Sequence, residues 1–401
     1  MPGIALRGSA VLTGRHEHRP GWVVVSGPQI DTVGTGPLPP GTPVVDVGDR
    51  VIAPGFLDVH VHGGGGAQIN GDSPQQVSRS AAAVARFHVR HGTTGLLATT
   101  VSDTPQRLVN AVKGIADATR ADPAGSARIL GAHLEGPWLA AGRAGAQNPA
   151  ALREPSTAEL QALLAASSGT VRMLTIAPEL PGAMSVIRAA ADAGVIVSVG
   201  HTGAAAQTAA AAFDAGARHV THLFNAMLGL HHRRPGPVGA ALTDARVSVE
   251  VIADGVHLHP SVLAVVCAAA GNRVVAVTDA MAAAGLGPGR YELGGLEVVV
   301  DGQRATLADQ PQTLAGSLLT MDRAVATLVA AGVSLRAAIT AATTTPADLL
   351  GEARKGRIEP GADADLVILE PDLTVAATMV AGRAAYDRAN LLGAVSRPGR
   401  I

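Results

Sequence analysis

Two histidines separated by a single residue, His60 and His62, end an apolar run and are followed by four consecutive glycines. Alternate residues of a β-strand point to the same side, so both imidazoles can face one ligand. Neutral imidazole is a common ligand for zinc and related metals. The pair predicts a metal site at a strand end. Taken alone, it is equally compatible with two hydrogen-bonded structural histidines.

Three further candidate ligands are associated with other apolar runs. Glu135 lies in HLEGPW, His201 in VGHTG and His222 in THLFNAM, within its run. A carboxylate in so apolar a run is costly unless a cation or hydrogen-bond donors compensate its charge. We expect Glu135, His201 and His222 to hold a divalent metal that keeps an open position for water. Considered singly, either histidine could equally be a core or surface residue.

Asp279, in VTDAM, closes the last apolar run. A carboxylate beside a metal can take a proton from an attacking water molecule and later deliver it to a departing amine. We interpret Asp279 as the general base and acid, and as a metal ligand beside His60 and His62. The alternative is a purely structural ligand. Hydrolysis of an amide by an activated water is the chemistry that this set predicts.

The elements that must position these residues repeat along the chain. After Ala53-Pro54-Gly55, apolar runs alternate with helical segments, as in parallel α/β folds. We count eight runs: Phe56–His62, Gly95–Val101, Arg128–Gly136, Val171–Pro178, Val195–His201, His219–Asn225, Val247–Ala253 and Val274–Asp279. They predict a (β/α)8 barrel, whose active site forms at the C-terminal strand ends. All six candidate ligands would then converge.

We assign the barrel to residues 54–355, with an inserted hairpin at 291–307 and further helix at 321–350. Residues 1–53 contain short β-like runs and Gly/Pro turns, which indicate small antiparallel strands. Residues 356–401 return to short strands. We expect the two ends of the chain to pair into one small β domain beside the barrel.

Composition narrows the class of protein. The chain has 401 residues, enough for a barrel of about 250 residues and an accessory domain. A net charge of −1 without a basic cluster argues against nucleic-acid binding. No run reaches the ~18 apolar residues of a membrane span, and the N-terminus lacks a signal-peptide pattern. Cys267 is the single cysteine. We therefore expect a cytoplasmic enzyme.

Seven segments together resemble the N-acetylglucosamine-6-phosphate deacetylases of the amidohydrolase superfamily. They are HVHGGGG, HLEGPW, VGHTGA, THLFNAM, IADGVHLHP, VTDAMAAAG and LAGSLLTMDRA. The resemblance runs from about Ala53 to Pro346. THLFNAM and the ADG-x-H segment are far more specific than the His-x-His pair. The resemblance implies hydrolysis of N-acetylglucosamine 6-phosphate to glucosamine 6-phosphate and acetate. It assigns the main metal to Glu135, His201 and His222.

The same resemblance implies the substrate contacts. Asn225 and the backbone of Ala226 would receive the phosphate, and His257 would bind the sugar hydroxyls. Arg233 would add positive charge, in the site of a neighbouring subunit if the chain forms a homodimer. Guanidinium suits phosphate, although a solvated loop is the plainer explanation of Arg233. The wall around the sugar and its acetyl group would come from residues Leu314, Ala315, Gly316 and Ser317.

One position departs from the family pattern. Several members carry a histidine that is thought to orient the acetyl carbonyl, where this chain has Gln147. Its amide can donate a hydrogen bond but cannot carry charge. Either a metal stabilises more of the oxyanion here, or Gln147 acts as a weaker donor. We expect one or two divalent ions per subunit, zinc first, with iron, manganese or cobalt as alternatives.

Two other functions stay open. One is another amidohydrolase, such as a cyclic amidase, an isoaspartyl dipeptidase or a deaminase. Many of these bridge two metals with a modified lysine, whereas Lys113 falls in a predicted helix and Lys355 in a linker. The other is a non-catalytic scaffold with the same fold, which typically loses its metal ligands.

The remaining polar candidates have weaker signals. His133 shares strand parity with Glu135, and is either a support for the metal site or an ordinary core histidine. Asp254 could cap the loop that presents His257. Five histidines have no converging partner and are interpreted as surface or structural residues: His16, His18, His88, His91 and His219.

Overall fold

The computed structural model describes residues 3–14, 16–121 and 124–393. Its central sheet has eight parallel strands in the order β17-β16-β15-β14-β13-β12-β11-β8. Val61 pairs with Ala280, and the Asp279 N–H donates to the His60 carbonyl at 2.9 Å, so the sheet closes on itself. The predicted barrel is confirmed. Its strands are β8 Phe56–Val61, β11 Thr93–Thr100, β12 Arg128–Glu135, β13 Val171–Ile176, β14 Ile196–Val199, β15 His219–Val220, β16 Ser248–Ile252 and β17 Val274–Val277.

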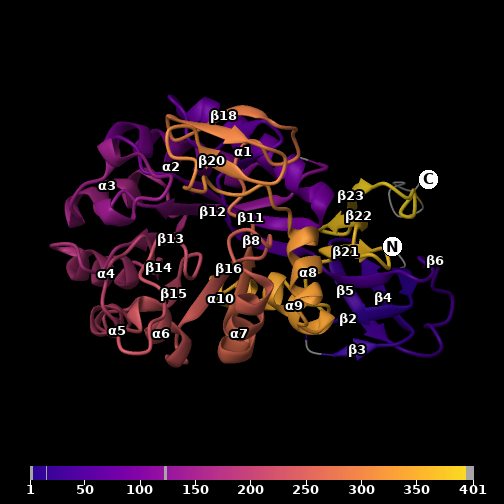
Figure 1. Cartoon of the computed structure of the whole chain (residues 1–401). Helices are drawn as coiled ribbons and strands as arrows, with labels where there is room; N and C mark the ends of the chain where they lie inside the picture. The colour runs from indigo at the N-terminus through magenta and orange to yellow at the C-terminus, as the bar shows by residue number, and fades with distance from the viewer. Residues whose placement is uncertain (1–2, 15, 122–123, 394–401) are drawn as a thin grey trace.

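Helices surround the barrel (Figure 1). They are α1 Pro74–His88, α2 Pro105–Arg120, α3 Thr157–Ala166, α4 Ala183–Asp192, α5 Ala206–Asp214, α6 Gly236–Thr243, α7 Pro260–Ala270, α8 Met321–Ala330, α9 Leu335–Ala342 and α10 Thr344–Leu350. Apolar side chains of strands and helices share one large core. None of the helices in the described part of the chain is both long and apolar enough to cross a membrane.

Several predicted strands extend beyond the C-terminal ends of the observed strands. These ends carry the candidate site residues. The sixth run was assigned through Asn225, but β15 ends at Val220. His222 therefore lies in a turn after the strand and not within it. The reason is local: His222, Phe224 and Ala226 all have positive φ angles, which no strand accommodates. Similarly, His201 and Asp279 each lie two residues past their strands.

The predicted hairpin after the last barrel strand is a three-stranded antiparallel sheet, β18 Gly289–Leu293, β19 Leu296–Val300 and β20 Ala305–Leu307. Leu293 and Val298 pack with Val101 and Met281, which follow barrel strands β11 and β17. This sheet therefore lies against the loops at the C-terminal end of the barrel, where it appears in orange in Figure 1. The predicted helix at 321–350 is divided into α8, α9 and α10.

Strands from both ends of the chain form the sheets beside the barrel, in indigo and yellow in Figure 1. A four-stranded sheet has the order β5-β4-β1-β6, and a six-stranded sheet has the order β23-β22-β21-β7-β2-β3. The strands are β1 Ile4–Gly8, β2 Ala10–Leu12, β3 Glu17–His18, β4 Gly21–Ser26, β5 Gln29–Gly34, β6 Val44–Asp46, β7 Val51–Pro54, β21 Leu366–Leu369, β22 Val375–Val380 and β23 Arg383–Asp387.

The pairing of these strands differs in part from the expectation. β1 pairs with β6, and β2 with β7, in parallel, so the N-terminal strands are not all antiparallel. β7 and β21 are joined antiparallel, and side chains of both ends share a core that includes Ile52 and Ile368. Lys355, predicted in a linker, is buried and pairs with Asp363 and Asp365. The domain limits at 53 and 356 stay a prediction.

Candidate metal centre and active site

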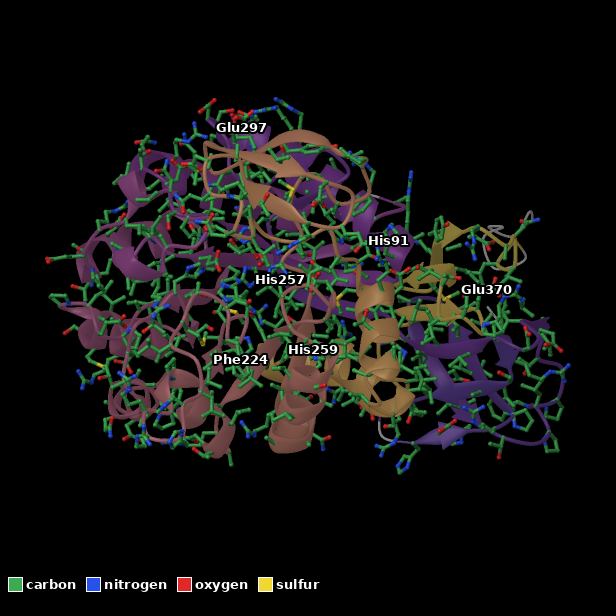
Figure 2. All side chains as sticks on the ribbon, in the orientation of Figure 1. His91, Phe224, His257, His259, Glu297 and Glu370 are labelled. Carbon is green, nitrogen blue, oxygen red and sulfur yellow. The ribbon has the colours of Figure 1, made fainter. Side chains whose placement is uncertain are left out.

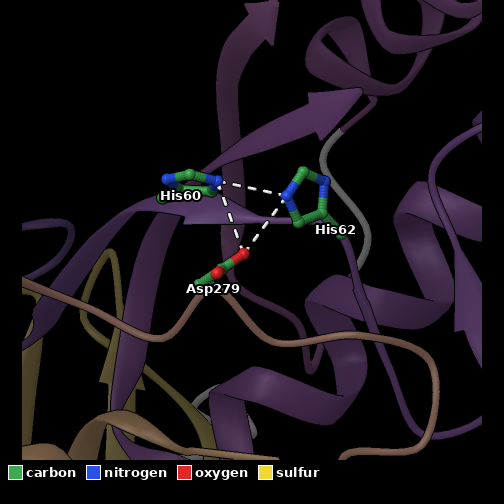
Figure 3. Close-up of side chains that lie close together, drawn as sticks. All are labelled: His60, His62 and Asp279. Atoms are coloured by element: carbon green, nitrogen blue, oxygen red, sulfur yellow. Dashed lines mark hydrogen bonds and ion pairs between the residues drawn. The ribbon is translucent and has the colours of Figure 1, made fainter. Parts of the chain in front are cut away.

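Two groups of buried side chains converge at the C-terminal end of the barrel. In the first, which we call site B, His60 and His62 approach with their Nε2 atoms 3.1 Å apart. Asp279 Oδ1 lies 3.5 Å from His60 Nε2 and 3.2 Å from His62 Nε2 (Figure 3). Strand β8 and the loop after β17 supply these residues. One cation can be contacted by all three side chains.

The second group, site A, consists of Glu135, His201 and His222. Glu135 Oε1 lies 3.2 Å from His201 Nε2 and 3.1 Å from His222 Nε2, and the two Nε2 atoms are 3.0 Å apart. Glu135 also faces site B: its Oε2 lies 3.3 Å from His62 Nε2. This carboxylate can therefore contact ions in both sites. The six predicted ligands are thus brought together.

Three of these ligands have a strained backbone. His201, His222 and Asp279 have φ angles of 46°, 27° and 49°, in the left-handed region that non-glycine residues rarely adopt. Each lies just past the end of a barrel strand, where the chain turns. Such conformations cost of order 1–3 kcal/mol each and persist where the surrounding structure holds them. The turn directs each side chain toward the barrel axis instead of along the strand.

Hydrogen bonds at the outer nitrogens test whether a cation fits. His62 Nδ1 lies 3.2 Å from the Thr99 carbonyl, and His201 Nδ1 lies 2.9 Å from the Arg143 carbonyl. A carbonyl can only accept, so each Nδ1 carries the hydrogen. In neutral imidazole the Nε2 lone pair then points inward at carboxylate oxygens and other Nε2 atoms. A cation between them removes the repulsion, so the donor set fits a metal.

Without a metal, protons on the histidines must remove the repulsion between the inward-facing nitrogen and oxygen atoms. Burial opposes charging of His60, but the carboxylates of Glu135, Glu250 and Asp279 raise its pKa well above the usual range. Burial likewise opposes charging of His62, yet hydrogen bonds to Asp279 and Glu135 raise its pKa to about 9. The pKa of Glu135 lies well below its ordinary value because the histidine charges outweigh burial. Metal binding therefore displaces protons.

The two sites open into one cavity at the C-terminal end of the barrel, with a volume of about 230 Å³. Six of the substrate-contacting residues that the sequence predicts line it: Gln147, Asn225, Ala226, His257, Leu314 and Gly316. Ala315 is fully buried and packs behind the wall with Met281. Arg233 does not line the cavity: it lies on an exposed loop, with Nη1 2.7 Å from His232 Nε2.

Gln147 has a fixed orientation. Its Oε1 accepts a hydrogen bond from the Ser102 N–H at 2.7 Å, and its Nε2 donates to Glu135 Oε2. The Ser102 N–H can bond only to the oxygen of the Gln147 side-chain amide. The NH2 group must therefore face Glu135 of site A. One of its two N–H bonds is used by Glu135. The other can donate to a substrate in the cavity, which Gln147 lines.

His257 is held by a neighbouring carboxylate. Asp254 Oδ2 lies 2.7 Å from His257 Nδ1, and Asp254 Oδ1 accepts the backbone N–H groups of Val256 and His257 at 2.8 Å. Burial raises the Asp254 pKa, but the hydrogen bond and charge of His257, together with the two backbone N–H groups, lower the pKa by more than burial raises it. The predicted capping by Asp254 is present. His257 lies near the middle of the molecule in Figure 2 and lines the cavity.

Two buried carboxylates near the site were missed from the sequence. Glu250 in β16 contacts His60 and His219, and Asp58 in β8 accepts the Thr278 hydroxyl at 2.6 Å. Burial raises the pKa of Asp58 to about 7, despite its hydrogen bonds. Both stand in apolar runs, the signal that drew attention to Glu135. Here the signal lies inside strands β8 and β16 and not at their ends.

The histidines outside sites A and B agree only in part with the prediction that they are surface or structural residues without converging partners. His219 was said to lack converging partners, which is wrong: it is fully buried between Glu250 and Ser248. His88 is also buried and contacts the Gly63 carbonyl at 2.9 Å, which makes it structural. His133 contacts the Val59 carbonyl and Thr175 but no metal-ligand side chain through a hydrogen bond. Its ring stacks edge-on against His60 at 4.8 Å.

A (β/α)8 barrel with buried histidine and carboxylate groups at its C-terminal mouth defines a class, the metal-dependent hydrolases of amidohydrolase type. The sequence profile of the Amidohydrolase family matches residues 51–385, and the chain belongs to this family. Enzymes of this family depend on metals, and both groups of residues above could hold one.

Within the family, the similar proteins are deacetylases of amino-sugar phosphates. The chain is 41% identical to N-acetylglucosamine-6-phosphate deacetylase of Bos taurus, over 84% of each chain. It is 40% identical to N-acetylgalactosamine-6-phosphate deacetylase of Escherichia coli O157:H7, over 84% of this chain and 88% of the other. A crystal structure of N-acetyl-D-glucosamine-6-phosphate deacetylase from Mycobacterium smegmatis superposes with a TM-score of 0.89 at 39% identity, covering 96% of this chain and all of the other.

Proposed function

We propose that this protein hydrolyses N-acetylglucosamine 6-phosphate to glucosamine 6-phosphate and acetate. The observation that carries the proposal is the position of Asp279, a carboxylate that lines the substrate-sized cavity and lies 3.2 Å from His62. The names of the similar enzymes supply the substrate class. Complete retention of both ligand groups argues against a non-catalytic scaffold. The two lysines of the chain argue against lysine-bridged amidohydrolases, because Lys113 lies in α2 and Lys355 pairs with Asp363 and Asp365.

The reaction needs a water molecule, a base and a group that stabilises negative charge. A divalent cation at these sites supplies Lewis acidity, which lowers the pKa of a water molecule and favours negative charge on the amide oxygen. Asp279 accepts one proton from the attacking water as the new carbon–oxygen bond forms. Asp279 then delivers that proton to the amide nitrogen as the carbon–nitrogen bond breaks. The amine and acetate leave, and Asp279 is again ionised.

Substrate contacts follow from the cavity lining. The free N–H of Gln147 is suited to donate to the acetyl carbonyl, where negative charge develops. His257 Nε2 faces the sugar hydroxyls, and Asn225 with the Ala226 N–H receives the phosphate. Leu314 and Gly316 form the wall around the acetyl group, with Ala315 packed behind them. The resemblance to the deacetylases implies these roles, and the position of the residues around one cavity supports them.

Arg233 fits a phosphate role only from a second subunit. Within its own chain it stands on the exposed loop outside the cavity. We propose a homodimer in which Arg233 of one subunit reaches the phosphate in the other. An exposed loop with His231, His232 and two arginines suits that contact because it carries the positive charge that phosphate needs. A cytoplasmic location is also proposed, supported by the single cysteine.

Zinc is the metal we propose, with two ions per chain, one in each site. The imidazole and carboxylate ligand set supports zinc but is also compatible with iron, manganese and cobalt. Glu135 faces both sites and could bridge them. Metal analysis of the protein purified without added metal identifies the ion. A count near one per chain at saturation argues against the second ion.

N-Acetylgalactosamine 6-phosphate is the second candidate substrate, because a relative of almost equal identity carries that name. The two sugars differ only in the configuration of one hydroxyl. Acetate release should be measured from both phosphates and from unphosphorylated N-acetylglucosamine, with metal-defined protein. We expect the glucosamine phosphate to give the highest kcat/KM. Equal rates with and without phosphate would refute a sugar-phosphate deacetylase, and release of ammonia would indicate a deaminase.

A further inference from the structure

A buried carboxylate outside the ligand set lies directly behind it. Glu250, in the middle of β16, is fully buried. Its Oε2 lies 3.0 Å from His60 Nδ1 and accepts the backbone N–H of His222 at 3.0 Å. Its Oε1 lies 2.9 Å from His219 Nε2. One carboxylate thus contacts a ligand of site B and the backbone of a ligand of site A.

The contacts of Glu250 determine which nitrogen of His60 is available. An ionised carboxylate only accepts, so His60 Nδ1 must donate to it. In neutral His60 this leaves Nε2 as a lone pair, and Nε2 is the atom that faces His62 and Asp279. His60 itself is fully buried, so no solvent can provide a substitute partner. Without Glu250, either tautomer of His60 becomes accessible.

His60 differs from the other ligands in its outer partner. His62 and His201 donate to neutral carbonyl groups. His222 Nδ1 has no partner among the described residues. Only His60, among the four histidine ligands described, faces a carboxylate on its outer nitrogen. A carboxylate raises the basicity of an imidazole ligand and supplies negative charge, and such outer partners typically change metal affinity 10–100-fold.

Glu250 is in turn held from behind by His219. The Ser248 hydroxyl lies 2.7 Å from His219 Nδ1 and can donate to it, which leaves His219 Nε2–H to donate to Glu250. Three N–H groups therefore converge on the two oxygens of Glu250. A buried carboxylate is tolerated only when paired in this way. An amide could not accept from both sides at once.

We infer that Glu250, oriented by His219, is a positioning residue that sets the Nε2-ligand tautomer of His60 and thereby tunes the affinity of site B for its metal ion. The inference rests on the proposed two-metal site but not on the proposed substrate. Loss of the Glu250 charge should weaken site B more than site A. His222 contributes to site A through Nε2, and Glu250 contacts only its backbone N–H.

The test uses zinc alone, with the metal-free full chain titrated in zinc buffers and the bound metal counted per chain. Wild type is expected to bind two ions. Glu250→Gln should lower the affinity of site B about 10-fold or more, and Glu250→Met, which lacks any acceptor, should lower it further. Thr175→Val is the matched control, because it removes two buried hydrogen bonds of the same barrel interior, to His133 and Thr221, neither of which is a metal ligand. It should retain two ions.

A second set of measurements, made in the His62→Ala variant, distinguishes the effect of Glu250 on site A from its effect on site B. His62→Ala removes a ligand of site B, so the zinc affinity that remains is that of site A. Adding Glu250→Gln to this variant should lower that affinity less than Glu250→Gln lowers the affinity of site B. His219→Gln keeps a donor to Glu250 and should bind two ions, whereas His219→Leu should weaken site B. Circular dichroism and thermal unfolding without metal confirm folding. If Glu250→Met does not fold, the zinc affinity of Glu250→Gln alone tests the inference.

Several results would overturn the inference. They are unchanged zinc affinity in Glu250→Gln, equal weakening of both sites, or equal weakening in Thr175→Val. If wild type binds a single ion, the two-metal proposal fails and this inference fails with it. Absence of deacetylase activity, by contrast, leaves the zinc measurements intact and contradicts only the proposed substrate.

Discussion

The side-chain amide of Gln147 donates a hydrogen bond to Glu135, on the carboxylate oxygen that faces His62. Gln147 is thus tied to the carboxylate that faces both ligand groups. Ser102 fixes the amide orientation from the other side. Gln147 can therefore hold Glu135 and still present one N–H to a substrate, and the amide that makes both contacts does not itself titrate.

Gln147→Ala should lower kcat roughly 10²-fold, the usual cost of losing one donor to a developing oxyanion. The substitution also leaves the Ser102 N–H without its acceptor, so thermal unfolding should be measured alongside steady-state kinetics. Asn148→Ala serves as the control, because Asn148 caps a short 3-10 helix next to Gln147 and does not line the cavity. A Gln147→Ala enzyme with unchanged kcat would remove Gln147 from the reaction.

Asp279→Asn should fold and retain zinc in site A but lose about 10²–10⁴-fold in kcat, the range for a general acid–base residue. The amide keeps the shape of the carboxylate but cannot take up the proton of the attacking water. The comparison is Asp301→Asn, which changes an exposed aspartate of the inserted sheet. Metal content should be measured on the same samples. Turnover near that of wild type would refute the assigned role of Asp279.

The sequence allowed prediction of much of this site, for a physical reason. Glu135, His201 and Asp279 are polar residues at the ends of apolar runs and His222 lies within one, and a parallel barrel brings the ends of its strands together. The turns that aim these residues were not foreseen, because positive φ at residues such as His222 depends on tertiary packing. The strand ends were therefore placed too late in the chain.

Other parts of the site had no local signal. Leu293 and Gln312 line the cavity only because the inserted sheet lies against the barrel mouth, a contact between segments distant in sequence. Glu250 did have a signal, a charge in the apolar run VSVEVIAD. It was missed because it lies inside its strand and not at its end. A carboxylate anywhere in a barrel strand needs a partner, and that partner can be a metal ligand.

The stability of the metal-free protein should fall as the pH rises from about 6.5 to about 9. The pKa of folded His62 is about 9, because its bonds to Asp279 and Glu135 outweigh burial, against about 6.5 when unfolded. A raised pKa contributes stability that is complete below the unfolded value and is lost as the pH passes the folded value. Thermal unfolding with a chelator, across this pH range, measures the effect.

Zinc should reverse that trend. Because ligand histidines must be deprotonated to bind, zinc affinity increases over the same pH range, and the stabilisation by added zinc should increase with it. His62→Gln removes the titrating group, and its metal-free form should show a weaker decline in stability. A metal-free wild type whose stability does not change between these pH values would contradict the proton-bearing cluster.

Asp254→Ala should act through His257 and not independently. Asp254 holds both the ring nitrogen and the backbone N–H of His257, so its loss leaves the ring free to turn away from the cavity. We expect KM to increase roughly tenfold, since a charge-assisted hydrogen bond contributes about 1.5–3 kcal/mol and only part of it is transmitted to the substrate. His257→Ala should raise KM by a similar or larger factor.

The informative measurement is the KM of the double variant. Two residues that act as one unit give a combined effect close to that of His257→Ala alone. Effects that multiply would show that Asp254 contributes to substrate binding without His257, and would place a second contact of its own in the cavity.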